Sequence, residues 1–247
     1  MSLFILGVFL VLMFLGIPVA VSLGMASLGA ILMYDTSTIA SAVKLMYSSM
    51  NSFTMVAVPL FFLAGILMDK GGVAEQIFSF CEDVVGWIHG GLGHVNIMTS
   101  ILFAGMSGSS VADVASIGAL CANAMIRSGY PSPYAWGTTL ASSMLASVIP
   151  PSILMVVAAS VAQVSMGQAL FAGIIPGVFL GLVMMVYNYF YCKKHGIGHR
   201  IPFNGGRLWK SFKRALPALM VPVILLGGMY TGYFTSTEAA RSACSTP

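Results

Sequence analysis

The sequence predicts an all-α protein that crosses a membrane several times. Of its 247 residues, 58% are hydrophobic and only 7% are charged, whereas a soluble domain has about 25% charged residues. The mean hydropathy is +0.93. The apolar segments are much longer than the roughly ten alternating residues of a membrane barrel strand. Because backbone groups must be hydrogen-bonded within each segment in lipid, the spans are expected to be helices.

The first apolar segment, residues 3–34, contains no charged residue. As a single helix it would be about 48 Å long, too long for a straight span of a 30 Å hydrocarbon core. Gly16 and Pro18 are therefore expected to bend or divide it. No basic stretch precedes this segment, so a cleaved signal peptide is not expected. A shorter apolar segment follows at 53–68, with Pro59 inside it.

Residues 69–94 combine charged and aromatic residues with a glycine-rich stretch, HGGLGH. This composition is typical of an amphipathic helix that lies in the membrane interface, followed by a turn.

Residues 95–126 form the most unusual segment, because a cluster of glycine and serine, GMSGSS, interrupts an apolar run whose one charge is Asp113. The arms on either side, 95–104 and 111–126, would be about 15 and 24 Å long as helices, each shorter than a 30 Å crossing. These lengths predict a re-entrant hairpin with its tip at the middle of the membrane, where irregular backbone is tolerated only inside protein or beside a wet cavity. The alternative is one tilted helix with a small-residue packing face.

The tip of such a hairpin offers groups for binding ions of both signs. The first arm ends in free carbonyl groups, which attract cations, and the second begins with free N–H groups, which attract anions. The hydroxyl groups of Ser107, Ser109 and Ser110 add oxygen ligands, and Gly108 allows close approach to the backbone. Oxygen ligands favour hard cations, so the pattern predicts a site for a cation such as Na⁺ together with a carboxylate substrate.

Asp113 shares one helix face with Ser109 and Ser116 because the three are spaced i, i+4 and i+7. An aspartate inside a membrane is by default an ion ligand or a proton carrier. Capping of the second arm is an equally good alternative, since a carboxylate in the first turn offsets the free N–H groups.

The uncharged segment 134–163 is interrupted at Pro150 and Pro151. Thr139, Ser143 and Ser147 are four residues apart and so lie on one helix face before this break. Proline frees carbonyl groups one turn earlier, and a discontinuous helix beside a hairpin is typical of the binding sites of secondary transporters. Hydrogen bonding between helices is the alternative role for the hydroxyl groups.

The last part of the chain has a complete span at 169–191 and a final apolar segment at 215–234. Between them lie seven of the eleven basic residues and no acidic residue, which predicts a cytoplasmic loop at 192–214. A nucleic-acid partner is not expected next to two spans, whereas contact with lipid headgroups is compatible with this charge. The four scattered cysteines have no metal-binding spacing and are expected to be free thiols.

Seven short motifs occur together along the chain. They are AVPLFFLAGILM (57–68), GGLGHVN (90–96), FAGMSGSSVAD (103–113), RSGY (127–130), IPPS (149–152), LFAGIIPG (170–177) and FTSTEAA (234–240). In this order they resemble the large permease subunit of the tripartite ATP-independent periplasmic (TRAP) transporters, of the dicarboxylate type. The resemblance covers nearly the whole chain.

The resemblance implies a fold, a function and partners. The fold would be the first half of an inverted-repeat elevator transporter with one re-entrant helical hairpin and a proline-broken helix. The function would be sodium-driven import of organic acids, of C4-dicarboxylate or sugar-acid type, across the bacterial inner membrane by a multi-pass subunit. The partners would be a small membrane subunit, a periplasmic solute-binding protein and the organic-acid substrate. Na⁺ would be the coupling ion, with no other cofactor and no enzymatic activity.

The resemblance also implies roles for particular residues and a division of the chain. Na⁺ would be bound through the backbone carbonyl or hydroxyl groups of Ser107, Gly108 and Ser109. Substrate or ion contacts would extend to Ser110 and Asp113, and the family's proline break would lie at Pro150 and Pro151. Ser143 and Ser147, on the hydroxyl face that leads into this break, are candidates for the same contacts from their spacing. Residues 1–94 would form scaffold-type spans and an interfacial helix, and 95–191 a transport core made of 95–126, 134–163 and 169–191. The basic loop at 192–214, and a last span with a divergent tail at 215–247, would complete the chain.

The chain departs from the family pattern at two places. Ser236 stands where the family has a proline before its T-E-A-A motif. The second inverted repeat does not follow before Pro247, so the chain is expected to be a truncated or frame-shifted form that does not transport alone, since one hairpin is half of a pseudo-symmetric site.

Three other functions are compatible with parts of the sequence. Gly105-Met106-Ser107-Gly108 matches the G-x-S-G motif of rhomboid-type proteases, but that chemistry needs a base near the serine, and the histidines lie at segment ends or in the basic loop. A non-transporting structural membrane subunit and another Na⁺- or H⁺-coupled inverted-repeat carrier are the remaining alternatives.

Overall fold

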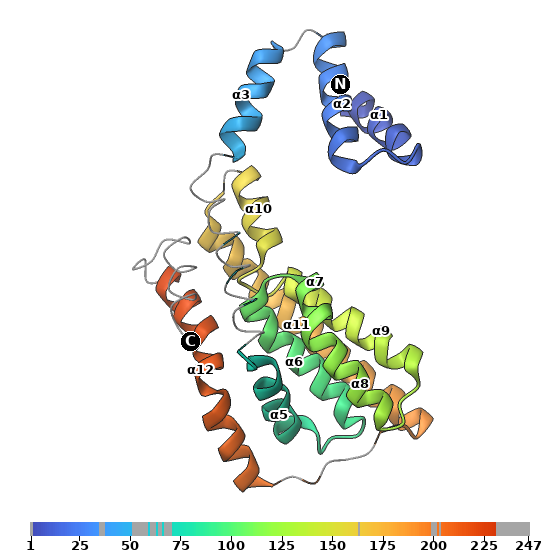
Figure 1. Cartoon of the computed structure of the whole chain (residues 1–247), viewed down its shortest axis with the longest axis vertical. Coiled ribbons are helices and arrows are strands. Elements are labelled where there is room, and N and C mark those ends of the chain that lie inside the picture. The colour runs from blue at the N-terminus through green and yellow to red at the C-terminus, as the bar shows by residue number, and fades with distance from the viewer. Residues whose placement is uncertain are drawn as a thin grey trace. The chain divides into compact units, whose positions relative to one another are not determined.

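The computed structural model describes residues 2–34, 38–50, 59, 63, 66, 71–162, 164–198, 202 and 204–230. The regular structure of these residues is entirely helical, as the sequence predicted (Figure 1). Contacts divide the chain into two compact units, residues 1–52 and 53–247, and each is described by itself. Most of the predicted span at 53–68, and the whole motif at 234–240, lie outside the described residues.

The first unit contains three helices, α1 (Ser2–Phe14), α2 (Val19–Tyr34) and α3 (Ile39–Met50). Helices α1 and α2 form a hairpin and pack closely against each other. The predicted division near Gly16 and Pro18 is confirmed, and Gly16 has φ +82°. Ser22, Ala26 and Ala30 are the buried residues of α2. They are four apart on one face, and their small size lets α1 approach closely.

The second unit is built around α6. In chain order its elements are α5 (Val73–Val85), α6 (Gly91–Ser107), α7 (Ser110–Asp113), the π-helical turn η2 (Val114–Gly118), α8 (Ala119–Arg127), α9 (Ser132–Ser143), the 3-10 turn η3 (Met144–Ser147), α10 (Ile153–Ala162), α11 (Met166–His195) and α12 (Gly205–Tyr230). Helix α6 contacts α5, α8, α9, α11 and α12, and Figure 1 shows it inside this group.

The core of this unit lies between α5, α6 and α8. Ile77, Val95, Phe103 and Met125 are fully or almost fully buried in one cluster. Cys81, Cys121 and Cys192 are buried free thiols, as expected for cysteines that act as small apolar residues.

The segment predicted to be a hairpin consists of two packed helical arms. The first arm is α6, and the second runs through α7, η2 and α8 and packs against it. The first arm has 17 residues and is about 26 Å long, so the predicted 15 Å was too short. Helix α6 begins earlier because Gly90, with φ +76°, places the glycine-rich stretch in its first turn. The depth of the tip in a bilayer stays a prediction.

The predicted interruption of segment 134–163 is confirmed. Helix α9 continues into η3, and the next helix, α10, begins at Ile153, after Pro150 and Pro151. The longest helix, α11, has 30 residues with Pro176 inside it. Among the described helices, it is the one with the length and apolar composition needed to cross a membrane.

The basic segment is only partly a loop, which corrects the prediction for 192–214. Helix α11 continues to His195, and four of the bases lie on α12: Arg207, Lys210, Lys213 and Arg214. Helix α12 packs against α5, where Arg207 Nε lies 3.3 Å from Asp83 Oδ1. Ser211 donates a hydrogen bond to the other carboxylate oxygen of Asp83. Burial raises the pKa of the neighbouring Glu82 carboxyl, and the Arg207 guanidinium opposes that shift.

Candidate functional site

The tip of the hairpin and the proline break are in direct contact. The backbone N–H of Ile153 donates a 3.0 Å hydrogen bond to the carbonyl oxygen of Gly108. Gly108 has φ +59°, and a Cβ added there would lie 2.2 Å from the carbonyl oxygen of Pro151. Glycine is therefore needed at 108 both for its backbone conformation and for this close approach.

Serine hydroxyl groups cap the broken helix ends on both sides of this contact. Ser109 Oγ accepts a 3.4 Å hydrogen bond from the N–H of Ala112, and Ser152 Oγ accepts a 3.3 Å bond from the N–H of Met155. Ser152 also donates to the carbonyl oxygen of Ser147 at 2.7 Å. The Ser109 hydroxyl, which was predicted to bind a cation, thus caps the second arm of the hairpin. Each carbonyl oxygen at the tip has two lone pairs, so one remains for a further contact after a single hydrogen bond is formed.

Two further serines connect the tip to its surroundings. The hydroxyl groups of Ser110 and Ser147 are hydrogen-bonded to each other, which joins the second arm to η3. Ser107 is buried, and its Oγ accepts a 3.5 Å hydrogen bond from the N–H of Ser109. Both features hold the irregular backbone at the tip in one conformation.

Asp113 lies directly after this tip and is fully buried. Neither of its carboxylate oxygens has a hydrogen-bond partner among the residues that the structure describes. The side chains of Ser143 and Ser100 face it, and Ser143 Oγ also lacks a partner within the described part of the chain. The N-cap of α7 is Ser109, so hydrogen-bonded capping is not the role of Asp113. A buried carboxylate without partners is costly unless a proton or a cation neutralises it.

The backbone immediately after Asp113 is the π-helical turn η2. Such turns occur mostly as single interruptions of α-helices and are frequent at functional sites. Gly118 ends η2 on the side facing α9, where an added Cβ would lie 3.0 Å from Thr139 Cγ2.

A layer of buried polar side chains joins α6 to α9 beside the carboxylate. Asn96 Nδ2 donates a 2.7 Å hydrogen bond to Thr139 Oγ1, and Thr139 donates to the carbonyl oxygen of Ala135 at 2.8 Å. The hydroxyl groups of Ser100 and Ser142 share a 3.0 Å bond. Because every one of these residues is fully buried, the layer sets the register between the two helices.

The structure brings most of the predicted site residues together in pairs. Gly108 contacts Pro151, Ser110 contacts Ser147, and Ser143 faces Asp113. The predicted stripe of Thr139, Ser143 and Ser147 therefore has three different neighbours, which are Asn96, Asp113 and Ser110. Ser116, placed on the Asp113 face by its spacing, donates to the carbonyl oxygen of Ala112 in its own helix.

Sequence reasoning missed Asn96, Ser100, Ser142 and Ser152. Asn96 and Ser100 are spaced i, i+4 within the apolar stretch of the first arm, which is a usable signal for one polar helix face. Ser142 has no comparable signal, since its role depends on which face of α9 meets α6.

A groove opens beside the second arm of the hairpin, with a volume of about 650 Å³. Most of its lining is apolar; Ser110 and Ser143 belong to it, but the Ser143 hydroxyl itself is buried. The complete lining is Ser110, Val111, Val114, Ala115, Leu140, Ala141, Ser143 and Met144. The described residues contain no group of three or more His, Cys, Asp or Glu that could hold a metal ion.

Two discontinuous helices that meet beside a buried carboxylate are typical of membrane transporters of the secondary type. The particular family follows from comparison with known proteins. The chain belongs to the DctM component family of the tripartite ATP-independent periplasmic transporters, whose family model matches residues 6–246. This family consists of transporter permeases rather than enzymes, which sets the protease alternative aside.

Curated relatives agree with this assignment. The chain is 41% identical over 229 residues to the sialic acid TRAP transporter large permease protein SiaM of Vibrio cholerae, covering 93% of this chain and 54% of that protein. It is 36% identical to the C4-dicarboxylate TRAP transporter large permease protein DctM of the same species, covering 94% and 51%. It is 36% identical to the isethionate TRAP transporter permease protein DctMQ of Oleidesulfovibrio alaskensis, covering 96% and 38%. The chain thus spans about half the length, or less, of these relatives.

Proposed function

We propose that this chain contributes to the large permease of a sodium-coupled TRAP importer of an organic acid, as a multi-pass protein of the bacterial inner membrane. The observation that carries the proposal is the fully buried Asp113, whose carboxylate oxygens have no hydrogen-bond partner in the described part of the chain. It lies beside the contact between two broken helices, where secondary transporters place their ion and substrate sites.

Sodium suits this position because the groups that face it are oxygen donors. The Asp113 carboxylate would neutralise the ion, and the hydroxyl groups of Ser143 and Ser100 face the same space. Hard cations prefer such ligands. Asp113 lies four residues after Ser109, the cap of the second arm, so ion binding would stabilise the tip formed by Ser107, Gly108 and Ser109. Carbonyl oxygens of that tip are the further ligands we propose.

An organic acid is the proposed substrate. The relatives are named for sialic acid, C4-dicarboxylates and isethionate, all of which are anions at neutral pH. The groove beside the second arm is mostly apolar, with Ser110 in its lining, and would hold the apolar part of such a substrate. Ser147 is hydrogen-bonded to Ser110, and Pro151 contacts Gly108 at the hairpin tip, so these two residues and the neighbouring Pro150 are the further substrate contacts we propose. A small membrane subunit and a periplasmic solute-binding protein are the proposed partners, as the word tripartite in the family description implies.

Sodium binding can be tested on the purified chain in detergent by measuring its melting temperature in NaCl and in choline chloride of equal ionic strength, which keeps charge screening constant. Na⁺ at 100 times its dissociation constant stabilises a protein by about 2.7 kcal/mol. This corresponds to a rise of roughly 5–11 °C for a chain of this size. Asp113→Asn should remove this difference, and Glu75→Gln, which changes an exposed carboxylate on α5, should retain it. Equal melting temperatures of the unmodified chain in the two salts would contradict sodium binding.

A proton is the second candidate for the same carboxylate, because both of its oxygens are free of partners among the described residues. In that case the melting temperature would fall as the pH rises, since deprotonation leaves an uncompensated buried charge. Asp113→Asn would then remove the pH dependence, and sodium would have no effect. The two salts and a pH series therefore separate the two forms of coupling.

A further inference from the structure

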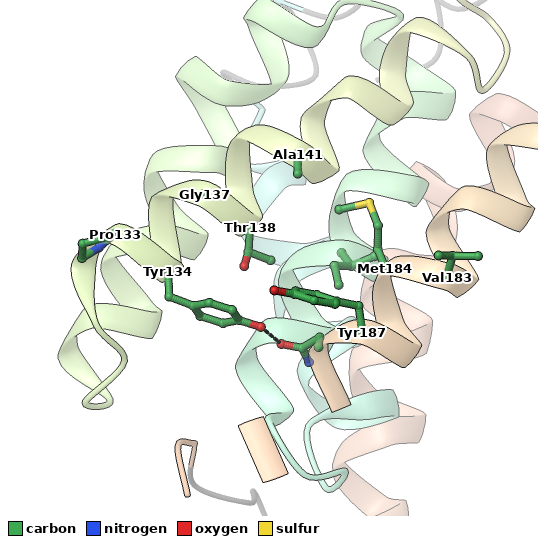
Figure 2. A pocket seen from close by; sticks show the side chains of 10 residues that line it. Pro133, Tyr134, Gly137, Thr138, Ala141, Val183, Met184 and Tyr187 are labelled. Carbon is green, nitrogen blue, oxygen red and sulfur yellow. Dashed lines mark hydrogen bonds between the residues drawn. The ribbon is translucent and has the colours of Figure 1, made fainter. Parts of the chain in front are cut away.

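A second groove lies between α9 and α11 (Figure 2), and one residue of α6 also lines it. Its volume is about 430 Å³. It is lined by Ile97, Pro133, Tyr134, Gly137, Thr138, Ala141, Val183, Met184, Tyr187 and Asn188. We propose that this groove binds an acyl chain of an anionic phospholipid, whose phosphate is held by the lysines at the end of α11.

The groove changes from apolar to polar along its length. Val183 and Met184 line it on α11, one to two turns before Tyr187 and Asn188. At the other end the Tyr134 hydroxyl donates a 2.8 Å hydrogen bond to Asn188 Oδ1. Figure 2 shows the Tyr134 and Tyr187 rings in the space between the two helices, near this bond. An amphiphile with a tail and a polar head matches this change in polarity.

Aromatic rings continue from this end toward the basic end of α11. Tyr134 and Tyr191 are stacked at 4.3 Å between ring centroids, and so are Tyr191 and His195. Tyr187, Tyr191 and Lys194 are spaced i, i+4 and i+7 and therefore share a helix face. Tyrosine is enriched at the boundary between hydrocarbon and headgroups, so these rings mark the level at which a lipid head would lie.

The length of the path fits one leaflet of a bilayer. Val183 and Lys194 are eleven residues apart on a continuous helix, which is about 17 Å. Half of a 30 Å hydrocarbon core is about 15 Å. Lys194 is exposed at the end of this path and shares the face of Tyr187 and Tyr191, so its ammonium group can reach a phosphate. Lys193 lies on the adjacent face, with its ammonium group 5.8 Å from the centre of the Tyr189 ring, and adds positive charge at the same end.

Two features favour lipid over a protein as the occupant. Helix α11 has the length and apolar composition of a span, and its surface next to the groove is open, with Phe190 64% and Tyr187 62% exposed. The segment from Lys193 to Arg214 holds seven basic residues and no acidic one, which attracts anionic headgroups at a membrane surface.

Native mass spectrometry of the purified full chain tests the proposal, with phosphatidylglycerol or phosphatidylcholine added. Gly137→Leu should fill the groove, since a Cβ at 137 meets nothing within 4 Å and leucine is the better helix former. It should lower phosphatidylglycerol binding about tenfold, because two or more methylene groups of the tail lose their contacts. Gly167→Leu is the matched control, because position 167 is equally open and lies outside the groove. Lys193→Ala with Lys194→Ala should remove the preference for phosphatidylglycerol over phosphatidylcholine.

A photo-reactive benzoylphenylalanine introduced at position 187 identifies the occupant in cells. A mass increase equal to one phospholipid supports the proposal. Crosslinking to another protein or to a second copy of this chain, with no lipid adduct, would overturn it. Equal phosphatidylglycerol binding by the unmodified chain and by Gly137→Leu would overturn it as well. Neither readout depends on sodium binding or transport, so the result is independent of the proposed function.

Discussion

Gly108→Ala tests the close contact between the hairpin tip and the proline break. The substitution adds a Cβ to a residue with φ +59°, at 2.2 Å from the carbonyl oxygen of Pro151. The left-handed conformation costs about 1–2 kcal/mol for any residue with a side chain. The overlap with a backbone atom adds about 1–3 kcal/mol, the range found when a packed interior is overfilled. We therefore expect a loss of about 2–5 kcal/mol in the free energy of unfolding.

Gly196→Ala is the control that separates the two contributions. Gly196 has φ +63°, close to that of Gly108, but a Cβ there meets nothing within 4 Å. It should lose only the conformational part, so the two variants should differ by about 2 kcal/mol, or roughly 4–8 °C in melting temperature. Thermal unfolding of both variants in the same detergent measures this difference. If Gly108→Ala melts no lower than Gly196→Ala, the two broken segments are not packed as described.

Three further substitutions test other contacts. Asp83→Asn removes the ion pair with Arg207 and should lower the free energy of unfolding by only about 1 kcal/mol, because the Arg207 side chain is 55% exposed. High salt should reduce this loss by screening the charges. An equal loss in 1 M salt would contradict an ion pair. Asn188→Ala removes the hydrogen-bond partner of Tyr134 Oη and of the Gly90 carbonyl oxygen, so the free energy of unfolding should fall by about 1–3 kcal/mol. Asn123→Ala, on an exposed face of α8, is the control and should leave the melting temperature unchanged. Ser110→Ala should lower the free energy of unfolding by about 1 kcal/mol, because its hydroxyl group loses the hydrogen bond to Ser147. In a double-mutant cycle with Ser147→Ala, the losses of the two single variants should not add up in the double variant.

Helix breaks were predictable because their causes are local. Pro18, Pro150 and Pro151 lack a backbone N–H and clash with the preceding turn, and the helices end before them as expected. The start of α6 was placed too late, because HGGLGH was interpreted as a turn. Most of it is helical in the structure, since Gly90 and Gly91 allow close packing against Asn188, Cys192 and the backbone of Gly86.

The functional region was predictable in composition but not in pairing. A glycine and serine cluster beside an aspartate in an apolar run indicates a polar site in any fold. Ser109 and Ser152 cap helix ends through residues three positions along the chain, whereas the position of Ser143 beside Asp113 depends on a contact between residues 30 positions apart. Helical periodicity predicts the helix face on which a residue lies, but not which helix packs against that face.

The sequence by itself determined that this is a helical membrane protein, that its helices break near Pro18 and at Pro150 and Pro151, and that it resembles the TRAP large permeases. These properties follow from hydropathy, from proline and glycine chemistry, and from short motifs that act within a few residues. Only the tertiary structure decided that Gly108 packs on Pro151, that Asp113 is buried without a hydrogen-bond partner among the described residues, and that a groove between α9 and α11 leads toward Lys194. The physical reason is that burial and close packing arise between segments far apart in the chain, where side-chain shape selects one arrangement among many with the same pattern.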